Sequence, residues 1–257
     1  MSYYTHEEYT IYYKVCGEGE PLLLIHGSTA SSSMLEEEVD FYAAYFTVIV
    51  VDILGHGQSE RLEEFPGDFW NENASVLHGL CQQLNIKKVN ILGTSGGAII
   101  GLNFAITYPE LTQRVIADSF IGEELSLEEA HALEEERTRA KQHGAERFWR
   151  TMHGEDWEQV IDADTKMLLH FAQHYRNNFH DNLDKIQCPV LIIGSLQDNL
   201  IKNIAQKACH VAKKIPSSTT VFSPQGDHPL MLSQKTFFRK VVLDFLREET
   251  LLFEVSQ

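Results

Sequence analysis

The chain has 257 residues, and its 21 Lys and Arg residues against 37 Asp and Glu residues give a formal net charge of −16. Hydrophobic residues make up 43% and charged residues 23%, which is typical of a globular protein rather than a disordered one. Carboxylates repel phosphate groups, so we expect neither a nucleic-acid partner nor an anionic-membrane partner. The longest unbroken aliphatic runs have four residues, whereas a bilayer span needs about 20.

The N-terminal segment 1–8 has no basic region followed by an apolar one, so we do not expect a signal peptide. The cysteines are scattered without any C-x-x-C spacing, which argues against a zinc ribbon or a disulfide scaffold. We therefore expect reduced thiols and a cytoplasmic location. The cysteines are Cys16, Cys81, Cys188 and Cys209.

Strand-like and helix-like segments alternate along the chain. Residues 9–15 alternate strictly between two faces, which predicts a half-exposed edge or hairpin strand. Helices are predicted at 71–84 and at 98–108, the second ended by Pro109. Continuous apolar runs predict buried parallel strands, so the whole pattern favours a doubly wound α/β sheet. The runs are Pro21–Ile25, Val48–Val51, Val89–Leu92, Val115–Ala117 and Val190–Ile193, followed by a last strand-like run at Thr219–Phe222.

Residues 122–187 break this alternation, because they contain no strand-like run. They open with the acidic, helix-prone stretch 123–136, and they are too long to be a loop. We therefore predict a helical lid at 122–187. It is inserted into one core domain that consists of residues 1–121 and 188–257.

The segment Leu92–Gly97 (LGTSGG) follows a predicted strand and begins a predicted helix, as a G-x-S-x-G nucleophile elbow requires. Gly93 and Gly97 leave room for a strained strand-to-helix turn. The start of the helix places backbone N–H groups and a partial positive charge beside the Ser95 hydroxyl. Ser95 is the predicted nucleophile, and the alternative is a purely structural turn.

Acyl transfer also needs two N–H donors for the oxyanion that develops on the substrate. One is expected from Gly96, the residue after the nucleophile. The other is expected from the loop after the strand that leads into His26-Gly27-Ser28, and we assign it to Ser28. His26 and Gly27 are predicted to be structural residues near the site, and the alternative for them is a turn with a buried histidine.

A general base is expected further along the chain. Of the 12 histidines, His228 follows the strand-like run 219–222, at the sheet edge where such folds build their sites. The chain order of nucleophile, acid and histidine favours Asp198 as the acid that orients His228. Asp118, one strand earlier, is the competitor, and Asp227 is interpreted as a turn residue.

His170 and His174 are four residues apart and would share one face of a helix, as two metal ligands can. No third ligand stands at a recognisable spacing, and His180 is only a loose candidate, so we expect no metal and no other cofactor. The acidic runs 36–38 and 134–136 are interpreted as solvated helix faces. Aromatic residues of the predicted lid either line a pocket or form the lid's own core, and we favour the core.

Residues 52–59 (DILGHGQS) resemble the D-x-x-G-x-G-x-S turn of the α/β-hydrolase superfamily. His26-Gly27, the elbow, Asp198 and His228 fall in that family's order. The resemblance implies the α/β-hydrolase fold, a mostly parallel doubly wound sheet with a helical lid inserted after the sixth strand.

Within the superfamily the chain looks most like the valacyclovir-hydrolase-like (biphenyl-hydrolase-like) serine hydrolases, which it resembles at residues 65–69 and 187–189. In the valacyclovir-type enzyme an aspartate follows the nucleophile and is associated with binding the substrate's amino group. Gly96 stands at that position here, so the resemblance does not imply specificity for α-amino-acid esters.

The expected activity is that of a serine hydrolase, a carboxylesterase acting on small or medium ester substrates. Ser95 would attack the carbonyl, His228 would move the proton and Asp198 would orient the imidazole. A serine at the elbow argues against the haloalkane dehalogenases and epoxide hydrolases of this fold, which use an aspartate. Alternatives on the same residues are a carbon–carbon bond hydrolase, a lactonase, a thioesterase and a proline-releasing aminopeptidase. A different class is a non-enzymatic ligand receptor, which need not keep all three residues.

Overall fold

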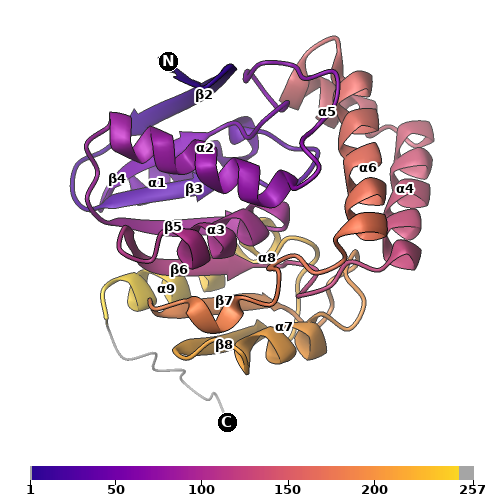
Figure 1. Cartoon of the computed structure of the whole chain (residues 1–257). Helices are drawn as coiled ribbons and strands as arrows, with labels where there is room; N and C mark the ends of the chain where they lie inside the picture. Colours follow the sequence, from indigo (N-terminus) through magenta and orange to yellow (C-terminus); the bar gives the residue numbers. More distant parts are fainter. Residues whose placement is uncertain (1, 249–257) are drawn as a thin grey trace.

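The computed structural model describes residues 2–248, and these residues form one eight-stranded sheet (Figure 1). The strand order is β1-β2-β4-β3-β5-β6-β7-β8. Strand β2 pairs antiparallel with β1 and β4, and the other neighbouring pairs are parallel. The strands are β1 (Ser2–His6), β2 (Tyr9–Cys16), β3 (Pro21–Ile25), β4 (Thr47–Val51), β5 (Val89–Thr94), β6 (Thr112–Asp118), β7 (Val190–Ser195) and β8 (Ser218–Ser223).

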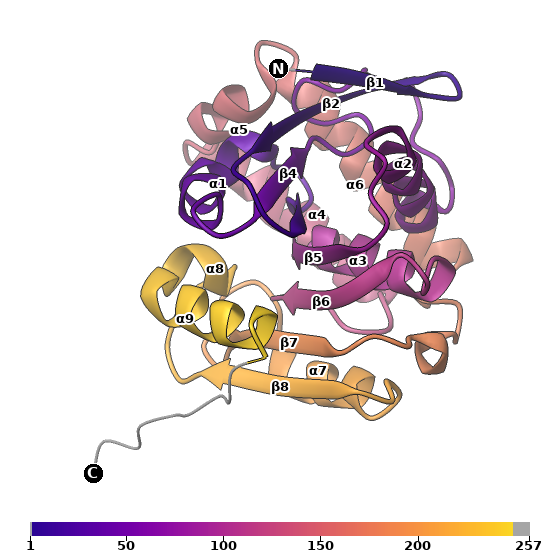
Figure 2. The same ribbon diagram turned by 90° about the vertical axis from the view of Figure 1, so that its left-hand side faces the viewer.

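The central strands are buried on both faces, because successive side chains of a strand point to opposite sides of the sheet. In β3, Leu23 and Ile25 pack in an apolar cluster with α2, α3 and α7, whereas Leu22 and Leu24 pack with α1 and α9 on the other face (Figure 2). This double burial explains the continuous apolar runs. The helices are α1 (Glu36–Tyr42), α2 (Phe69–Gln83), α3 (Gly96–Thr107), α7 (Ile204–Ala212), α8 (Leu230–Ser233) and α9 (Lys235–Leu246), and a 3₁₀ helix η1 (Ser32–Leu35) precedes α1.

The predicted doubly wound α/β sheet is confirmed. Of the two alternatives predicted for residues 9–15, the hairpin is correct and the edge strand is not, because β1 pairs with the outer side of β2. Tyr12 of β2 is consequently fully buried. The alternation over 9–15 gave no sign of β1, since the short segment 2–6 is mostly polar or exposed.

Between β6 and β7 the described chain forms the helices α4 (Leu127–Gln142), α5 (Glu146–His153) and α6 (Trp157–His174), followed by the 3₁₀ helix η2 (Leu183–Lys185). Helices α4, α5 and α6 stand together at one end of the sheet (Figure 1). Helix α4 begins with a capping box between Ser126 and Glu129, and Trp149 of α5 stacks on Trp157 of α6. These helices occupy the segment for which the sequence predicts a lid. The domain boundaries stay a prediction, and residues 249–257 of the second core segment lie outside the described residues.

Membrane association and redox state bear on the expected location. Among residues 2–248, no helix combines the length and the apolar character that a membrane span needs. Cys81 and Cys188 are buried, Cys16 and Cys209 are exposed, and all are free thiols. A cytoplasmic location stays a prediction.

Candidate active site

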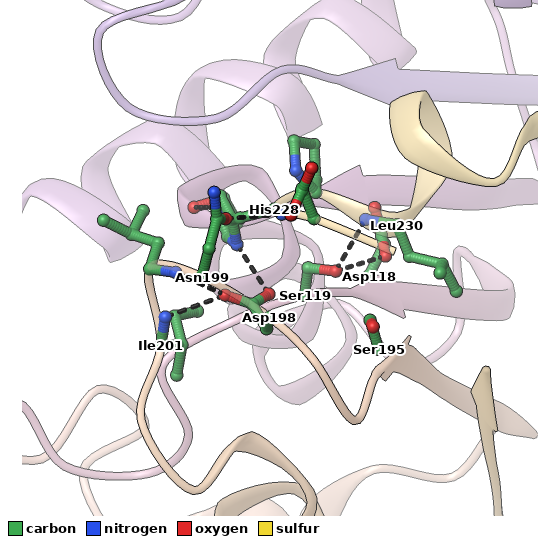
Figure 3. A network of polar contacts seen from close by, with 12 residues as sticks. Asp118, Ser119, Ser195, Asp198, Asn199, Ile201, His228 and Leu230 are labelled. Carbon is green, nitrogen blue, oxygen red and sulfur yellow. Dashed lines mark hydrogen bonds and ion pairs between the residues drawn. The ribbon is translucent and has the colours of Figure 1, made fainter. Parts of the chain in front are cut away.

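Three side chains from distant parts of the sequence meet where the parallel strands end. Ser95 follows β5, Asp198 follows β7 and His228 follows β8. His228 Nε2 lies 3.1 Å from Ser95 Oγ. His228 Nδ1 lies 2.9 Å from Asp198 Oδ2 (Figure 3). Because a carboxylate oxygen only accepts, Nδ1 carries the proton of that bond, and Nε2 is the nitrogen that faces the Ser95 hydroxyl.

Ser95 occupies the turn between β5 and α3 with φ 54° and ψ −120°, a backbone conformation that is unusual for a residue with a side chain. Two close backbone crossings hold this turn. A Cβ on Gly93 would lie 2.2 Å from the Gly97 carbonyl oxygen, and a Cβ on Gly97 would lie 2.3 Å from the Ile25 carbonyl oxygen. The G-x-S-x-G spacing is therefore a steric requirement of the turn.

Asp198, and not Asp118, contacts the histidine ring. The second oxygen of Asp198 accepts the backbone N–H groups of Leu200 at 2.9 Å and Ile201 at 2.8 Å. Burial is the largest single influence on this carboxyl and favours its neutral form. The hydrogen bond and charge of His228, together with the two N–H groups, outweigh burial and hold the pKa of Asp198 below its ordinary value. The group is therefore an anion at neutral pH.

Asn199, the residue after Asp198, also contacts His228, and nothing else in the sequence indicates this role. The backbone N–H of His228 donates to Asn199 Oδ1 at 2.9 Å. The loop after β7 thus binds both the ring and the backbone of His228. Asp227, interpreted as a turn residue, is exposed.

The predicted oxyanion donors lie beside each other. A Cβ on Gly96 would be 3.2 Å from the Ser28 nitrogen, and a Cβ on Gly27 would be 2.9 Å from Ser95 Cβ. In the described part of the chain, the N–H groups of Ser28 and Gly96 have no hydrogen-bond acceptor, so both are available to a substrate oxygen. For Gly96 this follows from its place at the first position of α3.

A cavity of about 210 Å³ opens beside Ser95 and His228. Pockets for drug-sized ligands are larger, at roughly 300–1,000 Å³. Phe148 and Trp149 of α5 line the cavity, so the lid aromatics contribute to more than the lid's own core. Glu136 also lines it and is half-buried. The apolar wall consists of Met34, Trp70, Ile99, Ile121, Leu125, Leu133, Leu168, Leu200 and Ile201. The interpretation of 36–38 as a solvated helix face is wrong at Glu38, which is buried and lies 2.7 Å from Arg239.

Two buried histidines support the loops around the cavity. His26 donates from Nδ1 to the Gly27 carbonyl at 2.8 Å and accepts the Ile53 N–H at Nε2, 3.1 Å away. His153 of α5 donates from Nε2 to the Thr29 carbonyl at 3.0 Å and accepts a backbone N–H at Nδ1. One donor and one acceptor on each ring define the neutral form. His26 is thus the buried histidine of a turn.

A third buried histidine, His56, joins the core to the helices above it. Its Nδ1 lies 2.8 Å from the Leu54 carbonyl oxygen, and its Nε2 lies 3.1 Å from Asp164 Oδ2. Both partners are acceptors that face the ring nitrogens, so the buried ring is fixed by one contact at each nitrogen. Arg137 of α4 lies 2.6 Å from the other oxygen of Asp164. The Asp164 carboxylate on α6 therefore contacts the Arg137 guanidinium of α4 and the His56 ring of the turn after β4, and both Asp164 and His56 are completely buried.

We expect the free energy of unfolding to fall as the pH is lowered from about 6.5. The ordinary pKa of histidine is 6.5, but burial, the largest influence on each, lowers the pKa to about 4 for His26 and to about 3 for His153. Between its lowered pKa and 6.5, each of these histidines is protonated in the unfolded chain but not in the folded chain. Each therefore lowers the free energy of unfolding by about 1.4 kcal/mol for every pH unit in that range. Asp118 has the opposite effect, because its pKa is raised from 3.8 to about 6 in the folded chain. Between these two pH values the folded chain binds a proton on Asp118 that the unfolded chain does not, which cancels the effect of one histidine.

Urea unfolding at a series of pH values measures this dependence. The variant His153→Gln should flatten the fall in stability by about 1.4 kcal/mol per pH unit. His143→Gln is a matched control, because His143 is exposed. An unchanged slope in His153→Gln would contradict the prediction.

The histidines considered as metal ligands have other neighbours. His170 and His174 of α6 lie with ring centres 4.4 Å apart, and His180 pairs with Asp68 at 3.0 Å. Within residues 2–248, no group of three or more His, Cys, Asp or Glu side chains is arranged to hold a metal ion.

The sheet, the elbow at Ser95 and the order of the site residues define a class of protein. A family model described as the alpha/beta hydrolase fold matches residues 20–148. The chain belongs to the α/β-hydrolase fold family. It is similar to the serine hydrolase BPHL of Homo sapiens, with 29% identity over 256 residues that cover 92% of this chain and 83% of that protein. The resemblance to the biphenyl-hydrolase-like serine hydrolases is thereby confirmed.

Solved structures share the fold at lower identity. A structure from work on carboxylesterases of Nitrososphaera gargenis superposes with a TM-score of 0.80 at 19% identity, covering 96% of this chain and 98% of that chain. The enol-lactonase of Burkholderia xenovorans LB400 superposes with a TM-score of 0.74 at 19% identity, covering 96% of this chain and 100% of that chain.

Proposed function

We propose that the chain is a serine hydrolase that cleaves carboxylic esters of small or medium substrates through an acyl-enzyme on Ser95. The observation that carries this proposal is the pair of hydrogen bonds, 3.1 Å and 2.9 Å long, that join Ser95 to His228 and His228 to Asp198. The name of the BPHL relative, a serine hydrolase, supports it. No cofactor takes part in this mechanism.

The first half of the reaction transfers the acyl group. Ser95 Oγ attacks the ester carbonyl while His228 Nε2 takes the hydroxyl proton. Asp198 keeps the protonated Nδ1 turned toward its carboxylate and stabilises the imidazolium. His228 then gives the proton to the alcohol oxygen as its bond to the carbonyl carbon breaks, which leaves the acyl group on Ser95.

The second half hydrolyses the acyl-enzyme. A water molecule gives a proton to His228 Nε2 and attacks the acyl carbon, and the proton returns to Ser95 Oγ as the carboxylic acid leaves. In both halves the carbonyl oxygen gains negative charge beside the N–H groups of Ser28 and Gly96. Each such donor typically contributes about 2.7–4 kcal/mol to stabilising the transition state.

The cavity supports a small substrate. Its volume of about 210 Å³ and its apolar wall suit a short acyl chain or a compact alcohol rather than a long lipid chain. The predicted partner is therefore a small-molecule ester.

The test is turnover of a series of p-nitrophenyl esters by the purified protein, together with labelling by a fluorophosphonate probe. We expect sustained release of p-nitrophenol, faster from the acetate and butyrate than from the decanoate. Mass spectrometry should find the probe on the peptide that contains Ser95. Binding of an ester without sustained turnover would support the receptor alternative instead.

The other hydrolase alternatives share the nucleophile and differ in the substrate. A carbon–carbon bond hydrolase, a lactonase, a thioesterase or a proline-releasing aminopeptidase would label at Ser95 as well. The proposal of an esterase is wrong if a vinylogous diketone, a lactone, a thioester or a prolyl amide is turned over with a far higher kcat/KM than any simple ester.

A further inference from the structure

Asp118 is the last residue of β6, and its side chain is completely buried. It binds the nucleophile elbow in two ways. Its carbonyl oxygen accepts the Ser95 N–H at 2.8 Å, and its carboxylate Oδ2 accepts the Thr94 hydroxyl at 2.9 Å. The end of β5 and the nucleophile are therefore fastened to Asp118.

The same carboxylate also binds the loop that carries His228 (Figure 3). Oδ2 accepts the Met231 N–H at 3.3 Å, and Oδ1 accepts the Ser119 hydroxyl at 2.7 Å. The Ser119 oxygen in turn accepts the Leu230 N–H at 3.0 Å. Leu230 and Met231 begin α8 directly after the histidine loop. Ser119 adopts a positive φ of 51°, which is the backbone conformation from which its hydroxyl makes this link.

We propose that Asp118 is a positioning residue that holds the histidine loop against the nucleophile elbow and thereby sets the rate at which Ser95 is acylated. Ser95 and His228 are 133 positions apart in the sequence and are joined directly by one hydrogen bond of 3.1 Å. Ser95 Oγ and His228 Nε2 must stay within hydrogen-bond distance while the proton moves, and a displacement of about 1 Å can lower the rate about 100-fold. This inference rests on the proposed function.

The carboxylate form of Asp118 fits its surroundings. The Thr94 and Ser119 hydroxyls and the Met231 N–H all donate to it, so a proton on the carboxyl would displace a donor. Burial is the largest influence and raises the pKa of Asp118 to about 6, against the hydrogen bonds from Ser119 and Thr94. The titratable groups that face it are His228 and Tyr42 of α1. Protonation of Asp118 should therefore loosen the link as the pH falls through about 6.

The variants Asp118→Asn and Ser119→Ala test the inference. Asp118→Asn should lower kcat for p-nitrophenyl acetate by about 10-fold and change KM by less than about threefold, because Asp118 does not touch the substrate. Ser119→Ala removes only the link to Leu230 and should lower kcat by about threefold. In the wild type, kcat/KM should fall below pH 6 more steeply than a single ionisation allows. Asp118→Asn should restore the slope of a single ionisation.

Asp227→Asn is the matched control, since it makes the same change beside His228 on an exposed side chain. It should keep the wild-type kcat and pH profile. If the wild type turns over no ester, the proposed function and this inference both fail. If the wild type is active and Asp118→Asn behaves like Asp227→Asn, the positioning role is wrong and the function stands. Should Asp118→Asn fail to fold, an unchanged kcat in Ser119→Ala overturns the inference.

Discussion

Ser95→Ala is expected to lower kcat for p-nitrophenyl acetate by about a millionfold and to abolish labelling by a fluorophosphonate. The loss is large because Ser95 Oγ is the atom that forms the acyl-enzyme, and without it His228 and Asp198 have no hydroxyl to deprotonate. The residual rate would come from the Ser28 and Gly96 N–H groups and from substrate binding. Stopped-flow absorbance measures the fast wild-type rate, and absorbance followed over a long time measures the slow residual rate of the variant.

The control for this variant is another serine to alanine change. Ser33→Ala lies outside the cavity and should label and turn over ester as the wild type does. Circular dichroism should show both variants folded. Labelling that persists in Ser95→Ala would assign the nucleophile to another residue and would refute the mechanism proposed for this chain.

Asp198→Asn is expected to lower kcat by about 10⁴-fold while leaving the fold intact. The geometry gives the reason. One carboxylate oxygen already accepts the N–H groups of Leu200 and Ile201, so the amide oxygen of asparagine would take that side. The amide NH₂ would then face His228 Nδ1 and force it to accept. The ring would carry its proton on Nε2, the wrong tautomer for a base toward Ser95.

The comparison of the two buried acids decides which one orients the histidine. Asp198→Asn should lose about 10⁴-fold in kcat and Asp118→Asn about 10-fold, because only the first changes the tautomer. Both should still react slowly with the fluorophosphonate, since Ser95 is present. A larger loss in Asp118→Asn would reverse the assignment, and equal small losses would leave neither acid as the orienting group.

Much of the fold is predictable from short apolar runs. The central strands read as continuous Leu, Ile and Val stretches because helices cover both faces of the sheet, and the observed β3 has the predicted bounds Pro21–Ile25. Strand β1 has no continuous apolar run and could not be predicted in this way. It is short and mostly exposed, and it is defined by its pairing with β2 rather than by its own pattern.

The residues of the candidate site are predictable to the extent that they sit in motifs. A nucleophile elbow has a fixed local shape, so the G-x-S-x-G pattern predicts the turn at Ser95. Asp198 and His228 follow from chain order and from their places after strands. Chain order favours Asp198 over Asp118, but only the structure shows which of them contacts His228, because Asp118 ends β6 and Asp198 follows β7 at the same edge of the sheet.

Contacts between distant segments that belong to no motif could not be predicted from the sequence. The Asp118 carboxylate binds residues that lie up to 113 positions away, and Arg137 finds Asp164 on another helix. Neither pair has a spacing that a helix or a strand would impose. Glu136 lines the cavity for the same reason, since the way α4 packs on α6 decides which of its side chains face inward.

The link from His56 through Asp164 to Arg137 has a consequence for related sequences. Replacing Arg137 alone leaves the buried Asp164 carboxylate without its cation, and replacing Asp164 alone leaves the buried Arg137 guanidinium without its anion. Breaking a buried ion pair from one side typically costs about 3–5 kcal/mol. The three positions, spread over 108 residues, therefore cannot drift independently. In descendants of this chain they should be kept together or lost together, and a relative with an apolar residue at one of them should have apolar residues at all three.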